Sequence, residues 1–273
     1  MQSFIYPAAR VSFMDFGRIC TLRFSARLLA FSLLCFAVGV SASEGKEEHL
    51  KSFHLNISPH GYPPYLIVDE DTPSGILWDV IAAIAPRLGY ELVPRKIPRK
   101  RVDNMLLDGY IDGTLRAIEW TEKPENYLFT HAVVNIEEVL FFDREFAYDY
   151  SHPSDLFGHT VVAHLGYKYP SLAPYFEQGK IKRFNVSSDK DLFRYVLLGD
   201  RFEAALADRL VGQWILRNEG LSNRLRPSTG SISKYGYRLM LRKDWTEFAQ
   251  DFNRELSAMR ENGELDAILA NYR

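Results

Sequence analysis

Cysteine is nearly absent from this sequence. The chain of 273 residues contains only 2, Cys20 and Cys35. Both lie in an N-terminal segment that we expect to be removed, so the mature chain would carry no thiol. A chain without thiols cannot form disulfides, bind zinc through cysteine or use a cysteine nucleophile. This absence excludes disulfide-stabilised scaffolds, cysteine-ligated zinc proteins and cysteine-dependent enzymes.

Common nucleotide-binding and catalytic motifs are missing as well. The sequence contains no G-x-G-x-x-G, no G-x-x-x-x-G-K-[ST], no G-x-S-x-G and no H-E-x-x-H pattern. Its 7 histidines do not show the spacing of metal ligands. We therefore predict no cofactor, no metal site and no catalytic residues.

The composition is that of a globular protein, with 47% hydrophobic and 25% charged residues and a net charge of -2. The N-terminal segment is rich in arginine, so the remaining chain is more acidic, at about -5. This charge argues against nucleic acid or an anionic membrane as the main partner.

The first 42 residues have the features of an export signal. An apolar stretch, Leu28–Val40, is followed by the small-residue exit Val40-Ser41-Ala42. Four arginines precede the stretch: Arg10, Arg18, Arg23 and Arg27. The stretch is shorter than the roughly 20 residues that span a bilayer. We predict a signal peptide over residues 1–42, with Met14 as an alternative start, and a mature chain in the periplasm.

Beyond this segment, strand and helix patterns alternate twice. The first unit predicts strands at 53–57, 91–93 and 111–115, a helix over 77–88 that Pro86 bends and Gly89 ends, and a helix over 101–108. The second predicts strands at 160–163, 181–186, 204–207 and 237–241, helices from Ser188 and over 209–218, and a C-terminal amphipathic helix. Ser188 and Asp191 suggest a capping box. Alternation of this kind indicates parallel sheets flanked by helices.

Ligands of open parallel sheets bind at the carboxyl ends of the strands, where loops and helix N-termini offer backbone donors. Four predicted loops meet this condition. They follow Ile57, Leu115, Ala163 and Ala207. We expect the binding residues to lie in these loops.

Several motifs in order resemble those of the family 3 extracellular solute-binding proteins. They are Tyr62-Pro63-Pro64-Tyr65, Gly75-Ile76-Leu77-Trp78-Asp79-Val80, Gly109-Tyr110-Ile111-Asp112-Gly113, Asp155-Leu156-Phe157-Gly158, Gly166, the stretch 199–208 and Asn262-Gly263-Glu264. Each motif alone is weak, but together they cover residues 53–273 in the family's order.

The resemblance implies an α/β fold of type II, in which two lobes, each a mainly parallel sheet flanked by helices, are joined by two hinge strands. Lobe 1 would comprise residues 48–136 and 235–273, and lobe 2 residues 137–234. The hinge strands would include residues 138–142 and 233–237. We expect a monomer that is not embedded in a membrane and that delivers a small polar solute to an ABC importer.

Aromatic and basic residues are the first ligand-binding candidates. Tyr62 occupies the family's aromatic position, and Pro63 and Pro64 stiffen its loop, so Tyr62 and Tyr65 can present ring faces to a solute. Arg116 follows a predicted strand and can grip a carboxylate with two parallel hydrogen bonds. The alternative for each is ordinary packing or solvent exposure.

The sequence departs from the amino-acid binders of the family at their T-x-T-x-x-R segment. Its first hydroxyl is replaced by Glu119, and its arginine by Lys123 after a one-residue deletion. Arg116 or Lys123 would then hold the carboxylate, or the ligand is not an amino acid.

The other candidates come from lobe 2 and from a basic run. Asp208 matches an aspartate that receives a ligand ammonium in the family, and it also precedes a helix, where aspartate is a favoured N-cap. Gly166 and Tyr167 lie in a loop that can bind an anion or form a plain turn. Arg99 and Arg101 belong to a basic run that either lines the cleft and selects an anionic solute or faces solvent.

The sequence therefore predicts a solute-binding protein that acts by lobe closure. Two alternatives stay open. One is an exported enzyme resembling cyclohexadienyl dehydratase, with Glu119 as the general acid. The other is a partner that presents its ligand to a membrane sensor.

Overall fold

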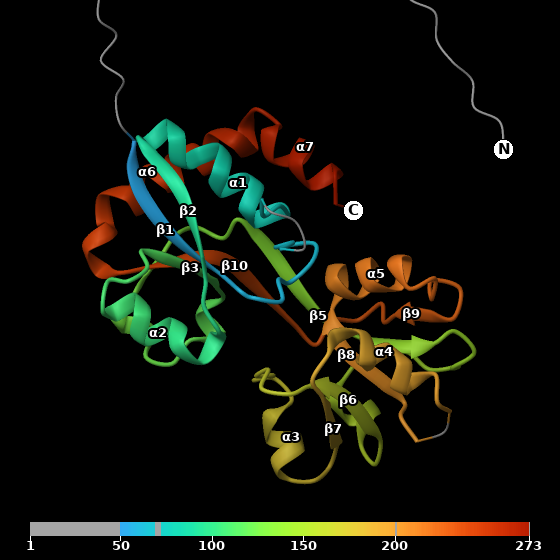
Figure 1. The fold of residues 1–273 in the computed structure, drawn as a ribbon. Coiled ribbons are helices and arrows are strands. Elements are labelled where there is room, and N and C mark those ends of the chain that lie inside the picture. Colours follow the sequence, from blue (N-terminus) through green and yellow to red (C-terminus); the bar gives the residue numbers. More distant parts are fainter. Residues whose placement is uncertain (1–49, 69–71, 200, 273) are drawn as a thin grey trace, which may run out of the picture. The chain divides into compact units, whose positions relative to one another are not determined.

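The computed structural model describes residues 50–68, 72–199 and 201–272. The signal peptide predicted for residues 1–42, together with Cys20 and Cys35, lies outside the described residues. Across the described ranges, no helix is long and apolar enough to cross a membrane. The described chain is a mixed α/β structure of two lobes (Figure 1).

Lobe 1 is built on strands in the order β2-β1-β3-β10. Both β2 and β3 run parallel to β1, whereas β10 is antiparallel to β3. The strands are β1 (Lys51–Ile57), β2 (Tyr90–Lys96), β3 (Gly113–Arg116), β4 (Leu128–Phe129), which pairs with β10, and the C-terminal part of β10 (Ser233–Leu241).

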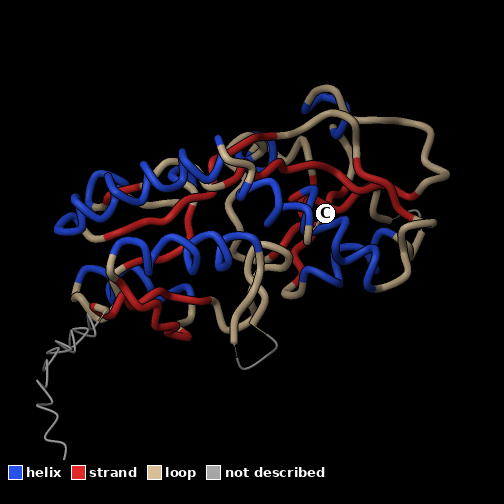
Figure 2. The backbone as a smooth tube through the Cα atoms, turned by 90° about the horizontal axis from the view of Figure 1, so that it is seen from above, coloured by secondary structure: helices blue, strands red, loops and turns tan. Residues whose placement is uncertain are grey.

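Helices cover both faces of this sheet (Figures 1 and 2). They are α1 (Ile76–Ile84), α2 (Arg99–Leu107), α6 (Thr246–Glu261) and α7 (Glu264–Ala270), with 3-10 turns at Ala85–Leu88, Ile118–Trp120, Pro124–Asn126 and Lys243–Trp245. Successive side chains of a strand point to opposite faces. On β10, Leu239 and Leu241 pack in the core with α1 and α6, while Met240 packs with α2.

Lobe 2 repeats the same strand order as β7-β6-β8-β5. Here β7 and β8 run parallel to β6, and β5 is antiparallel to β8. The strands are β5 (Val134–Asp143), β6 (Thr160–His164), β7 (Lys182–Val186), β8 (Ala204–Asp208) and β9 (Leu225–Pro227). The helices are α3 (Ala173–Glu177), α4 (Asp189–Val196) and α5 (Arg209–Asn218), with a 3-10 turn at Pro153–Leu156.

Two strands, β5 and β10, join the lobes. They pair with each other from Val134↔Tyr237 to Glu138↔Ser233. Beyond this stretch, β10 pairs with β3 and β4, whereas β5 pairs with β8 and β9. The two predicted hinge strands are therefore confirmed, and the exact lobe boundaries of 48–136, 137–234 and 235–273 stay a prediction.

Most helix ends and strands lie where the local sequence signals predict them. Gly89 ends the first helical segment with φ 80°, a conformation that glycine adopts at low cost, and Pro86 lies where the α-helix changes to a 3-10 turn. The predicted strand at 111–115 begins later, at Gly113, because Ile111 packs beneath α2 instead. The capping box at Ser188 is wrong. Its side chain makes no capping hydrogen bond, and Asp191 lies near Arg194.

Candidate functional site

The parallel strands of both lobes end near one group of aromatic side chains. Tyr62 and Tyr65 follow β1, Tyr167 follows β6, and Tyr237 lies on β10 where that strand leaves lobe 1. We call these four residues the tyrosine cluster. The loops after Ile57 and Ala163 were predicted to carry binding residues, and both contribute to it.

The rings of the tyrosine cluster contact each other across the two lobes. Tyr62 stacks on Tyr65 with 5.6 Å between ring centroids, and both meet Tyr237 edge-on at 6.3 and 5.5 Å. From lobe 2, Tyr167 meets Tyr62 edge-on at 6.3 Å. These distances lie in the range where aromatic pairs attract each other. The cluster is thus a contact between the lobes as well as an aromatic surface.

The environment of the cluster is poorly hydrated. Burial raises the pKa of Tyr237 to about 12, and burial with the charge of Asp208 raises that of Tyr62 well above its usual value. Tyr62 and Tyr237 therefore stay neutral at physiological pH. Neutral hydroxyls can both donate and accept hydrogen bonds, which suits a polar solute.

Two arginines of lobe 1 stand beside the cluster. Arg116, at the end of β3, is only 5% exposed, and its Nη2 donates to Asp103 Oδ1 at 2.9 Å. The side chain of Arg99, the first residue of α2, makes no hydrogen bond or ion pair within the described part of the chain. Desolvation and the charge of Arg116 lower the pKa of Arg99, although its side chain is exposed.

Both carboxylate oxygens of Asp208 accept hydrogen bonds from other residues. Its Oδ1 accepts hydrogen bonds from the Tyr65 hydroxyl and from the backbone amides of Leu210 and Val211, each at 3.0 Å. Its Oδ2 accepts one from the Glu137 amide at 2.9 Å. Asp208 is therefore the N-cap of α5, the alternative that the sequence left open beside its predicted ligand role, and it also bonds to lobe 1 through Tyr65.

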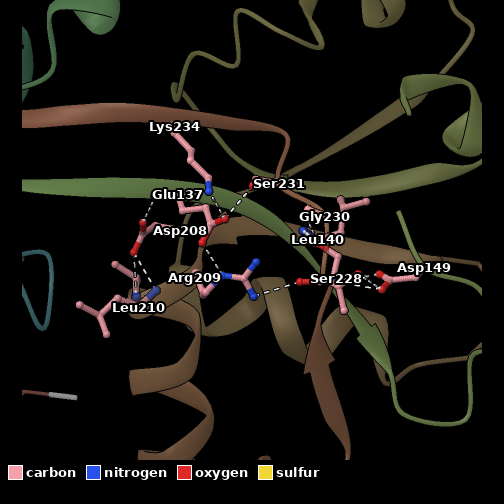
Figure 3. Close-up of polar contacts among 12 residues, drawn as sticks. Glu137, Leu140, Asp149, Asp208, Arg209, Leu210, Ser228, Gly230, Ser231 and Lys234 are labelled. Carbon is pink, nitrogen blue, oxygen red and sulfur yellow. Dashed lines mark hydrogen bonds and ion pairs between the residues drawn. The ribbon is translucent and has the colours of Figure 1, made fainter. Parts of the chain in front are cut away.

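The hinge strand β5 carries a second polar network next to Asp208 (Figure 3). Glu137 accepts hydrogen bonds from Arg209 Nε and Ser231 Oγ, both at 2.6 Å, and pairs with Lys234 Nζ at 3.3 Å. Arg209 also donates to the carbonyl of Ser228 at 3.0 Å. This network ties β5, β10 and the start of α5 together at the hinge.

Lobe 2 places a second carboxylate near the cluster. Asp189 is the first residue of α4 and is partly buried. Its charge raises the pKa of both Tyr62 and Tyr167, and desolvation raises its own. The His164 ring stacks on Tyr167 at 4.0 Å. Among the described residues, no hydrogen bond or ion pair satisfies the Asp189 side chain.

The fold and these side chains agree with the comparisons to known proteins. Residues 56–273 match the family model of bacterial extracellular solute-binding proteins, family 3. The chain belongs to this family. The resemblance noted from the sequence motifs is confirmed, and so is the two-lobed type II fold that it implies.

One curated relative is an arginine-binding extracellular protein, ArtP, of Bacillus subtilis (strain 168). It is 24% identical over 249 residues, which cover 88% of this chain and 94% of the relative. This family member and its relative are thus similar over nearly their whole lengths.

Solved structures of similar fold include binding proteins and a sensor. A histidine kinase sensor domain with similarity to periplasmic binding proteins has a TM-score of 0.68 at 23% identity, covering 82% of this chain and 97% of that one. An ancestral arginine-binding protein bound to arginine has a TM-score of 0.66 at 18% identity, covering 82% and 99%. The ancestral amino acid-binding protein AncCDT-1, a precursor of cyclohexadienyl dehydratase, has a TM-score of 0.65 at 17% identity, covering 81% and 95%. At these identities the likeness shows the fold alone.

Not every predicted residue lies near the cluster. The structure brings together Tyr62, Tyr65, Arg99, Arg116, Tyr167 and Asp208. Arg101 and Lys123 are exposed, and within the described residues no side-chain contact joins either of them to the cluster. Gly166, next to Tyr167 in the chain, is exposed too. Glu119 is exposed as well. The ligand roles of all these residues stay predictions.

The sequence reasoning missed three residues. Trp120 meets the Tyr237 ring at 5.8 Å, and its indole Nε1 is buried without a partner in the described part of the chain. Tyr237 was identified only as the start of a strand. Asp189 follows β7, and the rule that selected the other strand ends would have selected it too.

Two surface hollows lie away from the tyrosine cluster. One of about 320 Å³ lies beside α6 near His131, and one of about 390 Å³ lies between Phe142 and Glu203 in lobe 2. Within the described ranges, no three His, Cys, Asp or Glu side chains are grouped so that they could hold a metal ion. The tyrosine cluster with its charged neighbours is therefore our candidate solute site.

Proposed function

We propose that this chain is the periplasmic component of an ABC importer and captures a small carboxylate-bearing solute, an amino acid or a related acid, between its lobes. The observation that carries the proposal is the pair Arg99 and Arg116 beside a tyrosine cluster to which both lobes contribute. Two guanidinium groups next to aromatic surface suit a carboxylate with a small organic body.

Closure explains how the solute would be held. Lobe 1 supplies the arginines, and lobe 2 supplies Tyr167, whose contact with Tyr62 links the two sides. A further contact at the rim joins Lys168 of lobe 2 to Glu122 of lobe 1 at 2.7 Å. A solute between the lobes would be shielded from water, which strengthens each of its hydrogen bonds.

The arginine pair takes the place of the family's usual clamp. Glu119 and Lys123, which stand where that clamp is expected, are both exposed. Arg99 has no protein partner among the described residues, so its donors are available to an acid group. An exposed Glu119 also gives no support to the dehydratase alternative, because a general acid of raised pKa needs a buried site.

Calorimetry tests the binding role. We expect the purified mature chain to bind at least one of the standard L-amino acids or small dicarboxylates with 1:1 stoichiometry. Arg99→Gln should weaken this binding about tenfold or more, because it removes a charge-assisted hydrogen bond. Lys100→Gln, at an exposed neighbouring position, is the matched control and should leave it unchanged. If no such solute binds at millimolar concentration, the proposal is wrong.

Cell fractionation tests the location and the partner. Osmotic shock should release a protein that begins at Ser43, as the predicted cleavage after Ala42 requires. Deletion of the gene should abolish uptake of the solute found by calorimetry. Unchanged uptake, with loss of a transcriptional response to that solute, would instead favour a role as the partner of a sensor.

A further inference from the structure

Two acidic side chains face each other where the hinge strand β5 enters lobe 2. Glu138 of β5 is the register partner of Asp208 of β8. The Glu138 carbonyl accepts a hydrogen bond from the Ile232 amide, on the β10 side of β5, so Glu138 and Asp208 form a non-hydrogen-bonded pair. The side chains of such a pair lie on the same face of the sheet and approach each other closely. The two acids are therefore direct neighbours.

Both acids are buried, and no cation pairs with either of them in the described part of the chain. Glu138 is 5% exposed and Asp208 is 4% exposed. The basic side chains of the hinge, Arg209 and Lys234, pair instead with Glu137, on the opposite face of β5. A buried carboxylate needs a cation, a full set of donors or a proton. The pair of Glu138 and Asp208 thus lacks the positive charge that Glu137 has.

Each acid has one oxygen with room for a further donor. Glu138 Oε2 accepts a hydrogen bond from the Ser233 hydroxyl, whereas its Oε1 accepts none from the described residues. Asp208 Oδ1 accepts three hydrogen bonds, but its Oδ2 accepts one, from the Glu137 amide. A carboxylate oxygen offers about two lone-pair sites. A cationic group with several N–H donors could therefore bind both acids at once.

The pair of acids lies beside the tyrosine cluster. The hydroxyl of Tyr65, a member of the cluster, donates to Asp208 Oδ1 at 3.0 Å. Glu138 shares its face of β5 with Leu140, and Tyr167, another member of the cluster, packs against the part of the core that contains Leu140. The acids thus border the candidate solute site at the hinge, and the two arginines border it in lobe 1.

We propose that Glu138 and Asp208 together form the subsite for the positively charged group of the solute, while its acid group lies at Arg99 and Arg116. This assignment rests on the proposed solute-binding function. It adds Glu138 to the aspartate that the family resemblance selected. A solute that carries both charges, such as an amino acid, fits both subsites.

A cation bound at this subsite would ionise Glu138. Burial, together with the charge of Asp208, raises the pKa of the Glu138 carboxyl group to about 7. The other groups near it are the Ser233 hydroxyl and Tyr169, whose pKa burial raises and whose ring lies 5.1 Å from the Arg183 guanidinium. Because a nearby cation favours the carboxylate form, a proton should leave Glu138 when the solute binds. At pH 7, where the free group is half ionised, about half a proton should be released.

Calorimetry with the twenty standard L-amino acids tests the assignment. The tightest one is titrated at pH 7 in phosphate and in Tris buffer, whose different heats of ionisation reveal how many protons are released. We expect the wild type to release about half a proton. Glu138→Gln should lose this release and bind about 10- to 100-fold more weakly, the loss expected for a hydrogen bond between charged groups. Glu145→Gln, at an exposed position, is the matched control and should match the wild type in both respects.

A second probe separates a direct role from a structural one. The analogue of the same amino acid without its positively charged group should bind the wild type and Glu138→Gln equally and release no proton. The melting temperature of Glu138→Gln at pH 7 should be no lower than that of the wild type. Unchanged affinity for the amino acid in Glu138→Gln, or an equal loss for the amino acid and its analogue, would overturn the assignment while the binding function stands. A wild-type chain that binds none of the probes would overturn both.

Discussion

Glu137 and Glu138 are neighbours on the hinge strand β5, and the pKa values of their carboxyl groups are shifted in opposite directions. Desolvation acts on both groups. For Glu137 it is outweighed by hydrogen bonds from Arg209, Ser231 and Lys234, which lower the pKa to about 2. For Glu138 it dominates, since Ser233 alone among the described residues donates to the carboxylate and Asp208 repels it, and the pKa rises to about 7. The two sides of one strand thus provide opposite electrostatic environments.

The raised pKa of Glu138 predicts that the folded state loses stability as the pH rises. Its pKa is higher in the folded chain than the unfolded value of 4.5, so the folded state binds more protons between these values. Stability should fall from about pH 4.5 to pH 7 and stay low above it. We expect Glu138→Gln to be more stable than the wild type at pH 8 by about 1 to 3 kcal/mol, with the difference gone at pH 4.5. Urea unfolding at both pH values measures it, and an equal pH dependence in the two proteins would contradict it.

The Glu137 carboxyl group should make the opposite contribution to the pH dependence of stability. Its folded pKa is depressed, so its contribution is present above pH 4.5 and is lost as the pH falls through about 2. Its side chain is 25% exposed, so solvent screening reduces the contribution. Glu137→Gln should therefore be less stable than the wild type at pH 8 by about 1 to 2 kcal/mol. A gain in stability would show that the Arg209 network costs more than it contributes.

The bond from Tyr65 to Asp208 predicts a modest loss of stability in Tyr65→Phe. Both residues are buried, and the hydroxyl donates at 3.0 Å. We expect a loss of about 1 to 2 kcal/mol, seen as a fall of several degrees in melting temperature. Tyr148→Phe, at a side chain that is 73% exposed, is the control and should melt like the wild type. Equal melting temperatures for all three proteins would mean that the bond contributes nothing.

Gly212 lies in α5 against a core ring. A Cβ atom added there would overlap the Phe141 ring. Alanine gains up to about 1 kcal/mol over glycine within a helix, whereas overpacking costs about 1 to 3 kcal/mol. We expect Gly212→Ala to be destabilised on balance, by about 1 to 2 kcal/mol in urea unfolding. Gln213→Ala, at the next position of the helix, serves as the control. A more stable Gly212→Ala would show that the ring moves at little cost.

The fold was predictable because its signals are local. Alternation of Phe53, Leu55 and Ile57 marks a strand whose three side chains are all buried, and Gly89 marks a helix end that the backbone adopts. The order of family motifs then supplied the topology. The capping box at Ser188 failed because a side-chain hydrogen bond depends on rotamers that the spacing of residues does not determine.

The site was only partly predictable, because it depends on which side chains are already bonded. Asp208 was selected for its family position. Its cap bonds from Leu210 and Val211 are local, but the Tyr65 hydroxyl and the Glu137 amide that also satisfy it come from segments far away in the sequence. Asp189 was not selected from the sequence, because an acidic residue in the first turn of a helix is explained by the helix dipole alone. Arg99 is exposed, whereas Arg116 is buried and paired with Asp103. No pattern of residues in the sequence shows this difference.

Closure of two lobes around a solute is the central claim, and small-angle X-ray scattering tests it most directly. The mature chain would be unfolded and refolded to remove any bound solute, then measured with and without a saturating amount of the tightest solute found by calorimetry. The account predicts that the radius of gyration falls when the solute binds. An identical scattering curve in both states would contradict it.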